Sequence, residues 1–321
     1  MPDELAIGID VGGTKIAAGV VDEQGRVLAR RRADTPSSDP AAVLDVIGDL
    51  VDQLRTEHEV RALGIGAAGF VDATGSTVLF APHLPWRDEH LRHAVADRTG
   101  LLVVVENDAN AGGWAEWRFG AVQGEPDIVV VTLGTGIGGA IVIDGQPYRG
   151  RFGIAGEFGH MQVVPDGLPC DCGNRGCWEQ YASGRVLTRR GRAAAEAGTP
   201  LGHRLRDYAG GSVQGIQGFH VTEAARGGDE EAAAWFADVG DWLGVGMANL
   251  AAALDPGVFV VGGGLSDAGE MLLEPARAAF SRSLSGRGHR PEARIVPAGL
   301  GPEAGLIGAA DLARFTVQFK S

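Results

Sequence analysis

Residues 10–22 and 132–144 repeat one pattern at an offset of 122 positions, so that Gly12 falls on Gly134 and Asp22 on Asp144. Each segment reads as an apolar strand, a glycine turn, a second apolar strand and a turn that contains aspartate. The repeat predicts two related α/β halves. Two like halves that face each other would form a cleft, where ligands usually bind. Glycine hairpins are common, so an unrelated pair of hairpins stays open.

The hydrophobic periodicity predicts strands alternating with helices. Strands are expected over residues 5–10, 16–21, 26–32, 63–66, 101–106 and 258–261, with a second glycine-rich hairpin from residue 128. Helices are expected over residues 40–58, 107–119, 232–254 and 303–315. Asp39 before Pro40 marks the first helix start, because a capping residue followed by proline is typical there. The β-branched run 101–106 predicts a central strand.

Charge and cysteine content narrow the class of function. The formal net charge is −13, which gives the chain no general attraction to nucleic acid. The N-terminal segment lacks the basic residues and long apolar run of a signal peptide, and no stretch is apolar enough to cross a membrane. We therefore expect a cytoplasmic protein. The three cysteines lie together between residues 170 and 177, which favours a metal site over a disulfide framework.

Three glycine-rich turns follow buried strands, and they indicate nucleotide binding. Glycine lets the backbone approach a polyphosphate, Thr14 and Lys15 add a donor and a charge, and Asp10 can hold Mg²⁺ through oxygen or water. A plain β-hairpin is the alternative for this first turn. The second turn is not a Walker A loop, and a strand rather than a helix follows it. The candidate cofactor-binding residues are Asp10, Gly12, Gly13, Thr14, Lys15, Gly134, Thr135, Gly136, Gly262, Gly263 and Gly264.

A second constellation has the composition of a metal site. His160, Cys170, Cys172 and Cys177 have the spacing H-x9-C-x-C-x4-C, and such a closed Cys₃His set is what structural zinc uses. Four protein ligands leave no open position for water or substrate, so the expected role is structural.

Carboxylates and one imidazole form the candidate chemical centre. Asp108 follows the apolar run 101–105, where it could accept a proton from a substrate hydroxyl. From its position alone, a helix-capping role for Asn107 or Asp108 is equally open. Glu157, His160 and Glu179 lie beside glycines or the cysteine loop, and they suit the hydroxyls of a sugar. His160 could bind metal with one nitrogen and sugar with the other.

These motifs resemble the ROK family of sugar kinases and repressors over nearly the whole chain, from Gly8 to about Gly308. The family's motifs appear in order as residues 10–15, 106–110, 133–136, 157–160 and 170–179. The resemblance implies an α/β fold of the actin-like, hexokinase-like (ribonuclease H-like) class, a duplicated ATPase fold with two lobes around a cleft. The implied small lobe is 1–111 with 305–321, and the large lobe 112–304 carries the zinc loop and the oligomer interface.

The resemblance further implies an ATP- and Mg²⁺-dependent kinase, similar to bacterial glucokinases that act on the 6-hydroxyl of glucose, with a homodimer or homotetramer. Asp108 would be the catalytic base, and the implied sugar contacts are Gly69, Asn107, Asp108, Glu157, His160 and Glu179. Ala68 and His83 depart from the common family pattern near the sugar rim. N-acetylmannosamine, N-acetylglucosamine and fructose therefore stay alternative substrates. A repressor is disfavoured by the acidic balance and by a first motif that begins at Asp10, and a polyphosphate-dependent kinase by the zinc loop.

Overall fold

The computed structural model describes residues 4–36 and 38–320, apart from the side chains of residues 317–320. The chain forms two compact units. Unit 1 contains the described residues up to Val129, together with Ala140–Gly156 and the described residues from Gly299 onward. Unit 2 contains Val130–Gly139 and Glu157–Ala298.

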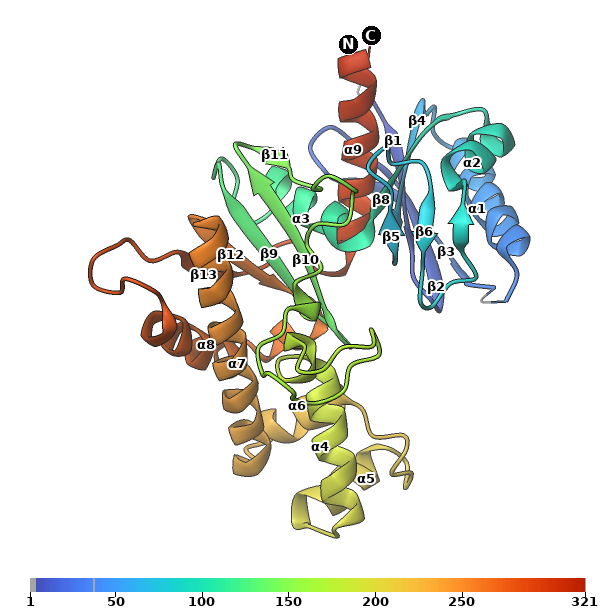
Figure 1. Ribbon diagram of the computed structural model, residues 1–321. Coiled ribbons are helices and arrows are strands. Elements are labelled where there is room, and N and C mark those ends of the chain that lie inside the picture. Colours follow the sequence, from blue (N-terminus) through green and yellow to red (C-terminus); the bar gives the residue numbers. More distant parts are fainter. Residues whose placement is uncertain (1–3, 37, 321) are drawn as a thin grey trace. The chain divides into compact units, whose positions relative to one another are not determined.

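The first five-stranded sheet lies in unit 1, with its parallel strands in the middle and at one edge (Figure 1). β1 pairs antiparallel with β2 and parallel with β4, β2 pairs antiparallel with β3, and β4 pairs parallel with β8. The order across the sheet is β3 (Val27–Asp34), β2 (Lys15–Val21), β1 (Ala6–Val11), β4 (Ala62–Ala67) and β8 (Leu102–Asn107). A three-stranded sheet is formed by β5 (Phe70–Val71), β6 (Val78–Phe80) and β7 (Arg87–Glu89).

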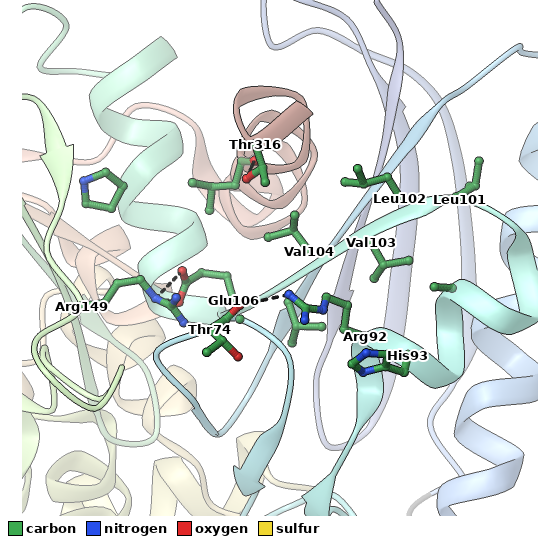
Figure 2. A pocket seen from close by; sticks show the side chains of 15 residues that line it. Thr74, Arg92, His93, Leu101, Leu102, Val103, Val104, Glu106, Arg149 and Thr316 are labelled. Atoms are coloured by element: carbon green, nitrogen blue, oxygen red, sulfur yellow. Dashed lines mark hydrogen bonds and ion pairs between the residues drawn. The ribbon is translucent and has the colours of Figure 1, made fainter. Parts of the chain in front are cut away.

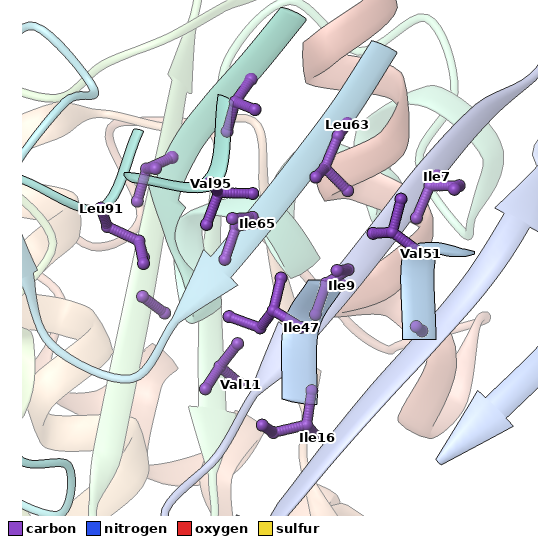
Figure 3. Close-up of a cluster of buried hydrophobic side chains, with 14 of the residues drawn as sticks. Ile7, Ile9, Val11, Ile16, Ile47, Val51, Leu63, Ile65, Leu91 and Val95 are labelled. Atoms are coloured by element: carbon purple, nitrogen blue, oxygen red, sulfur yellow. The ribbon is translucent and has the colours of Figure 1, made fainter. Parts of the chain in front are cut away.

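Apolar side chains of this sheet pack against α1 (Pro40–Arg55) and α2 (Leu91–Thr99). Figure 3 shows Ile9 and Val11 of β1 beside Ile47 of α1, and all three are fully buried. Asp39 caps α1 by accepting a hydrogen bond from the Ala41 backbone N–H, and Pro40 occupies the first turn, as the sequence predicted.

The opposite face of the sheet is covered by α9 (Ala304–Lys320), which also packs along α3 (Asp108–Phe119). Two strand glycines make this packing possible. A Cβ atom at Gly64 would lie 1.7 Å from the Ala309 carbonyl oxygen, and one at Gly8 would lie 1.9 Å from that of Leu306. Any side chain at either glycine would therefore push α9 away from the sheet.

The second five-stranded sheet has the same topological order as the first. Its order is β11 (Gln146–Pro147), β10 (Ile137–Ile143), β9 (Ile128–Leu133), β12 (Val258–Gly262) and β13 (Arg294–Pro297). The predicted repeat is therefore confirmed in the fold: the hairpin β1–β2 corresponds to β9–β10, and β4 and β8 correspond to β12 and β13. The duplicated α/β fold of the actin-like class is confirmed with it.

Apart from β12, β13 and parts of β9 and β10, the regular structure described in unit 2 is helical. The longest of its described helices, α7 (Glu230–Leu254), begins at the Asp229 cap and ends where Asp255 takes a left-handed conformation with φ 46°. Gly244 lets α7 pack closely on α8, because a Cβ there would lie 2.3 Å from the Ala276 carbonyl oxygen. The helices are α4 (Gly184–Glu196), α5 (Pro200–Tyr208), α6 (Gly218–Arg226), α7 and α8 (Glu270–Ser283), with short 3₁₀ turns η1 (Phe158–His160), η2 (Trp178–Gln180) and η3 (Gly264–Ala268). A fourth 3₁₀ turn, η4 (Gly301–Glu303), precedes α9 in unit 1.

One prediction about the first sheet is wrong. The run 101–106 was expected to form a central strand, but β8 lies at the edge of the sheet within the described part of the chain. Both α2 and α9 pack against the run, which accounts for most of its apolar character, although Leu102 is 41% exposed. Its free edge is partly covered as well, since the Val105 N–H donates to the Gly75 carbonyl oxygen over 3.3 Å.

The compact units also differ from the lobes proposed from the resemblance. Residues 112–129, 140–156 and 299–304 cluster with unit 1, whereas the proposed small lobe ended at residue 111 and resumed at 305. Packing of α3 along α9 accounts for the first of these segments. The boundaries of the two predicted lobes therefore remain a prediction. None of the described helices is long and apolar enough to cross a membrane.

Candidate active site

The carboxyl ends of the parallel strands in unit 1 bring the acidic residues together. Asp10 of β1 is in register with Gly66 of β4, which is in register with Glu106 of β8. Asp108 follows directly as the first residue of α3. Gly66 lies on β4, between β1 and β8. It leaves space next to Asp108, because even a Cβ atom at Gly66 would come no closer than 3.6 Å to that residue. Asp10 and Asp108 therefore flank one glycine position at the same edge of the sheet.

The helix cap in this region is Asn107, not Asp108. The Asn107 Oδ1 atom accepts a hydrogen bond of 3.0 Å from the Asn110 backbone N–H. Its Nδ2 donates to the Gly69 carbonyl oxygen over 3.1 Å. The Asp108 carboxylate accepts a hydrogen bond of 2.9 Å from the Ala109 N–H, and its other partners, the Asn107 side chain and its own backbone N–H, belong to the same turn. Unit 1 thus assembles Gly69, Asn107 and Asp108 and leaves the Asp108 carboxylate largely available for chemistry.

Burial changes the protonation of both carboxylates. It raises the pKa of the Asp108 carboxyl above its ordinary value. Burial, and secondly the charge of Asp108, raises the pKa of Asp10 from 3.8 to about 6. The start of α9 contributes to this burial, since Gly305 lies against the Asp10 carboxylate. Two carboxylates that share a desolvated site are suited to accept a proton and to attract a divalent cation.

The first glycine turn is a braced hairpin with exposed polar side chains. The Gly12 N–H donates to the Lys15 carbonyl oxygen over 3.0 Å, and the Thr35 hydroxyl donates to the Gly12 carbonyl oxygen over 2.8 Å. Thr14 and Lys15 are exposed. The hairpin alternative is therefore correct as a description of the backbone, and it still leaves Thr14 and Lys15 available to an anion.

The second and third glycine turns meet in unit 2. Gly263 has φ 83°, and a Cβ there would lie 2.5 Å from the Leu133 carbonyl oxygen, so only glycine fits. Gly134 accepts a 2.9 Å hydrogen bond from the Gly184 N–H at the start of α4. The two turns share a pocket of about 450 Å³ lined by Gly134, Thr135, Gly184, Arg185, Thr188, Arg192, Gln217, Gly218, Phe219, Thr222, Gly264 and Leu265.

Several residues of this pocket escaped the sequence analysis. Thr188 and Arg192 come from α4, and Phe219 from the start of α6. Phe219 is 57% exposed and contacts the His220 ring at a tilt of 42°, with ring centroids 3.9 Å apart. No motif marks these positions, because only the packing of α4 and α6 brings them to the glycine turns.

The four predicted metal ligands converge. Ligand atoms of His160, Cys170, Cys172 and Cys177 all lie within 4.8 Å of one another. The Cys172 and Cys177 sulfur atoms are 3.6 Å apart, and Cys170 Sγ is 3.7 Å from His160 Nδ1. A tetrahedral ion with bonds of ~2.3 Å to sulfur requires ligand separations of about 3.8 Å. The arrangement therefore fits a four-coordinate metal. Without one, burial raises the pKa of the Cys177 thiol to about 12.

The remaining sugar-site candidates surround this cluster. The second nitrogen of His160, Nε2, faces the Glu157 carboxylate at 3.9 Å. Glu179 is buried, and its Oε1 accepts from Cys170 Sγ over 3.2 Å. Its Oε2 lies so close to Gly136 that a Cβ there would be 2.4 Å away. Unit 2 thus brings the cysteine cluster, Glu157, Glu179 and the second glycine turn into one neighbourhood.

The duplicated sheets, the carboxylates at the strand ends and the glycine turns define an α/β protein of the actin-like ATPase class. A sequence profile of the ROK family matches residues 6–315. The chain belongs to the ROK family.

Individual relatives match along nearly the full chain. Glucokinase of Streptomyces coelicolor is 50% identical over 310 residues, which covers 97% of this chain and 98% of that protein. Glucokinase of Thermotoga maritima is 35% identical over 319 residues, covering 97% and 98%. Among solved structures, a ROK family glucokinase from Streptomyces griseus in complex with glucose and AMPPNP superposes with a TM-score of 0.88 at 54% identity, covering 97% of this chain and 99% of that one.

Proposed function

We propose that this protein is a glucokinase, which transfers the γ-phosphoryl group of ATP to the 6-hydroxyl of glucose. The observation that carries the proposal is the Asp108 carboxylate, half-buried next to Asn107, which bonds to Gly69, in a chain half identical to a glucokinase over nearly its whole length. The solved relative bound to glucose and AMPPNP supports the same pair of substrates.

In this proposal Asp108 accepts the proton of the sugar hydroxyl. Its raised pKa makes it a better proton acceptor than an exposed aspartate, and Asn107 fixes the turn that carries it. Phosphoryl transfer needs little covalent participation from the protein, so one positioned base and neutralised phosphate charge suffice. We assign the sugar hydroxyls to Gly69, Asn107, Glu157, His160 and Glu179.

The nucleotide would use the glycine turns. Gly12, Gly13, Thr14 and Lys15 offer donors for phosphate oxygens, and Asp10 is the candidate ligand of Mg²⁺, which would neutralise phosphate charge. Gly134–Gly136 and Gly262–Gly264 present bare backbone to the nucleotide. The 450 Å³ pocket between these turns and Phe219 is large enough for a nucleoside.

We further propose that His160, Cys170, Cys172 and Cys177 hold a structural zinc ion. Their separations support this ion, and a closed set of four protein ligands gives it no catalytic position. Zinc would also fix His160 and Glu179 through their contacts with Cys170. We also propose that the protein is cytoplasmic and forms a homodimer or homotetramer. Light scattering, which measures the molar mass, would test the number of subunits.

The deciding experiment measures ADP release by the purified protein with ATP and Mg²⁺ on glucose, mannose, fructose, N-acetylglucosamine and N-acetylmannosamine. Turnover that prefers glucose is the expected result. Turnover with only an N-acetylated sugar or fructose would keep the chemistry and replace the substrate. No turnover with any sugar, in protein that retains bound zinc, would refute the kinase assignment.

A further inference from the structure

A buried ion pair between Glu106 and Arg149 lies next to the turn that carries Asp108. Glu106, the residue before Asn107, is 5% exposed, and its Oε2 lies 2.9 Å from Arg149 Nε. The other oxygen, Oε1, accepts from the Asn107 backbone N–H over 2.8 Å and from Asn110 Nδ2 over 3.1 Å. One carboxylate therefore fixes both the end of β8 and the first turn of α3, on either side of Asp108.

Arg149 also reaches the hairpin that follows Gly69. Its NH2 group donates to the Asp72 carbonyl oxygen over 2.9 Å, and its NH1 group donates to that of Ala73 over 3.2 Å. This hairpin is itself ordered, because the Asp72 carboxylate accepts from the backbone N–H groups of Ser76 and Thr77. The guanidinium thus joins the Asp108 turn to the segment that carries Gly69.

The same two segments meet at a second point, where Asn107 Nδ2 donates to the Gly69 carbonyl oxygen. That contact joins two residues assigned to the sugar, whereas Arg149 contacts Glu106, Asp72 and Ala73. Figure 2 shows Arg149 and Glu106 side by side in the wall of a pocket, with Thr74 and Arg92 close by. The pocket has a volume of about 480 Å³ and is separate from the carboxylate pair, since neither Asp10 nor Asp108 lines it.

We propose that Arg149 is a positioning residue for phosphoryl transfer, which sets the Asn107–Asp108 turn through Glu106 and the Gly69 hairpin through Asp72 and Ala73. The inference rests on the proposed role of Asp108 as base. Arg149 touches no substrate in this proposal. Its loss moves the base relative to the sugar hydroxyl and lowers the rate of the chemical step, while the nucleotide-binding turns stay intact.

Two Arg149 variants test the proposal. Arg149→Ala should lower kcat by roughly 10- to 100-fold, the size expected for a base displaced by about 1 Å, and should leave the KM for ATP within about twofold. Arg149→Lys keeps the charge but not the planar fork, and it should fall between wild type and Arg149→Ala with an unchanged unfolding midpoint. Arg92→Ala is the matched control, because Arg92 lines the same pocket and donates to the Thr74 carbonyl oxygen without reaching Glu106.

Chemical rescue separates positioning from a general loss of structure. The 480 Å³ pocket borders the Glu106 carboxylate, so millimolar guanidinium should enter it and restore part of the kcat of Arg149→Ala. Rescue with no effect on wild type or Arg92→Ala supports the proposal. A kcat within twofold of wild type in both Arg149 variants, or an equal loss in Arg92→Ala, overturns it. An active Asp108→Asn enzyme would instead refute the base assignment, whatever Arg149 does.

Discussion

Replacing Asp10 by asparagine should make the protein more stable and inactive at the same time. Asp10 lies at the end of β1, where burial and the charge of Asp108 raise its pKa from 3.8 to about 6. Ionising Asp10 is therefore less favourable in the folded chain than in the unfolded chain. Asparagine has nearly the same shape as the protonated acid and removes this cost, but it also removes the carboxylate proposed to hold Mg²⁺.

The magnitude follows from linkage between protonation and folding. Between pH 4 and pH 6 the folded chain keeps a proton that the unfolded chain has released, so the wild type loses stability as pH rises through this window. With pKa values of 3.8 unfolded and about 6 folded, the free energy of unfolding of Asp10→Asn should exceed that of wild type by about 2 kcal/mol at pH 5 and about 3 kcal/mol at pH 7.5. Above pH 7 this difference in the free energy of unfolding should stay constant.

Urea unfolding followed by tryptophan fluorescence in Mg²⁺-free buffer measures the gap, since Trp86 and Trp114 are buried in unit 1. Asp45→Asn, an exposed substitution on α1, is the control and should show no such pH-dependent gain. A gap below about 1 kcal/mol at pH 7.5, or one equal at pH 5 and pH 7.5, would show that Asp10 is not desolvated as described. Full ATP-dependent turnover by Asp10→Asn would refute its proposed metal role.

Three further substitutions test the other parts of the site. Asp108→Asn should lower kcat at least about 100-fold while calorimetry shows glucose affinity nearly unchanged; near-normal turnover would remove Asp108 as the base. Cys172→Ala should lose the metal, measured by elemental analysis, and unfold at a lower temperature, because three ligands no longer close the site; a full equivalent of zinc in the variant would contradict the four-ligand proposal. Phe219→Ala should raise the KM for ATP about tenfold with little change for glucose, since a base would lose its stacking surface. Tyr208→Ala, an exposed aromatic residue outside the pocket, is its control.

Local chemistry made much of the fold and site predictable. Asp39 and Pro40 start α1, and Asp255 ends α7, because caps and breakers act within a few residues. The clustered cysteines with His160 indicated a metal site because ligand spacing in a loop is itself a local property. The repeat at 122 positions predicted two related α/β halves, and the two sheets of the same strand order confirm it, since equal patterns of strand and turn fold alike.

Tertiary structure decided what depends on distant segments. The edge position of β8 could not be read from its apolar run, because a strand covered by α2 and α9 looks the same in sequence as a central one. Arg149 gives no signal beside other arginines, yet the fold places it on Glu106, 43 positions away in sequence. Phe219 joins the glycine turns only through the packing of α4 and α6. The sequence by itself determined the residue types that chemistry requires and the turns that present them, because both are local; the partners that bury, orient and shift the pKa of those residues come from long-range packing, which only the folded chain defines.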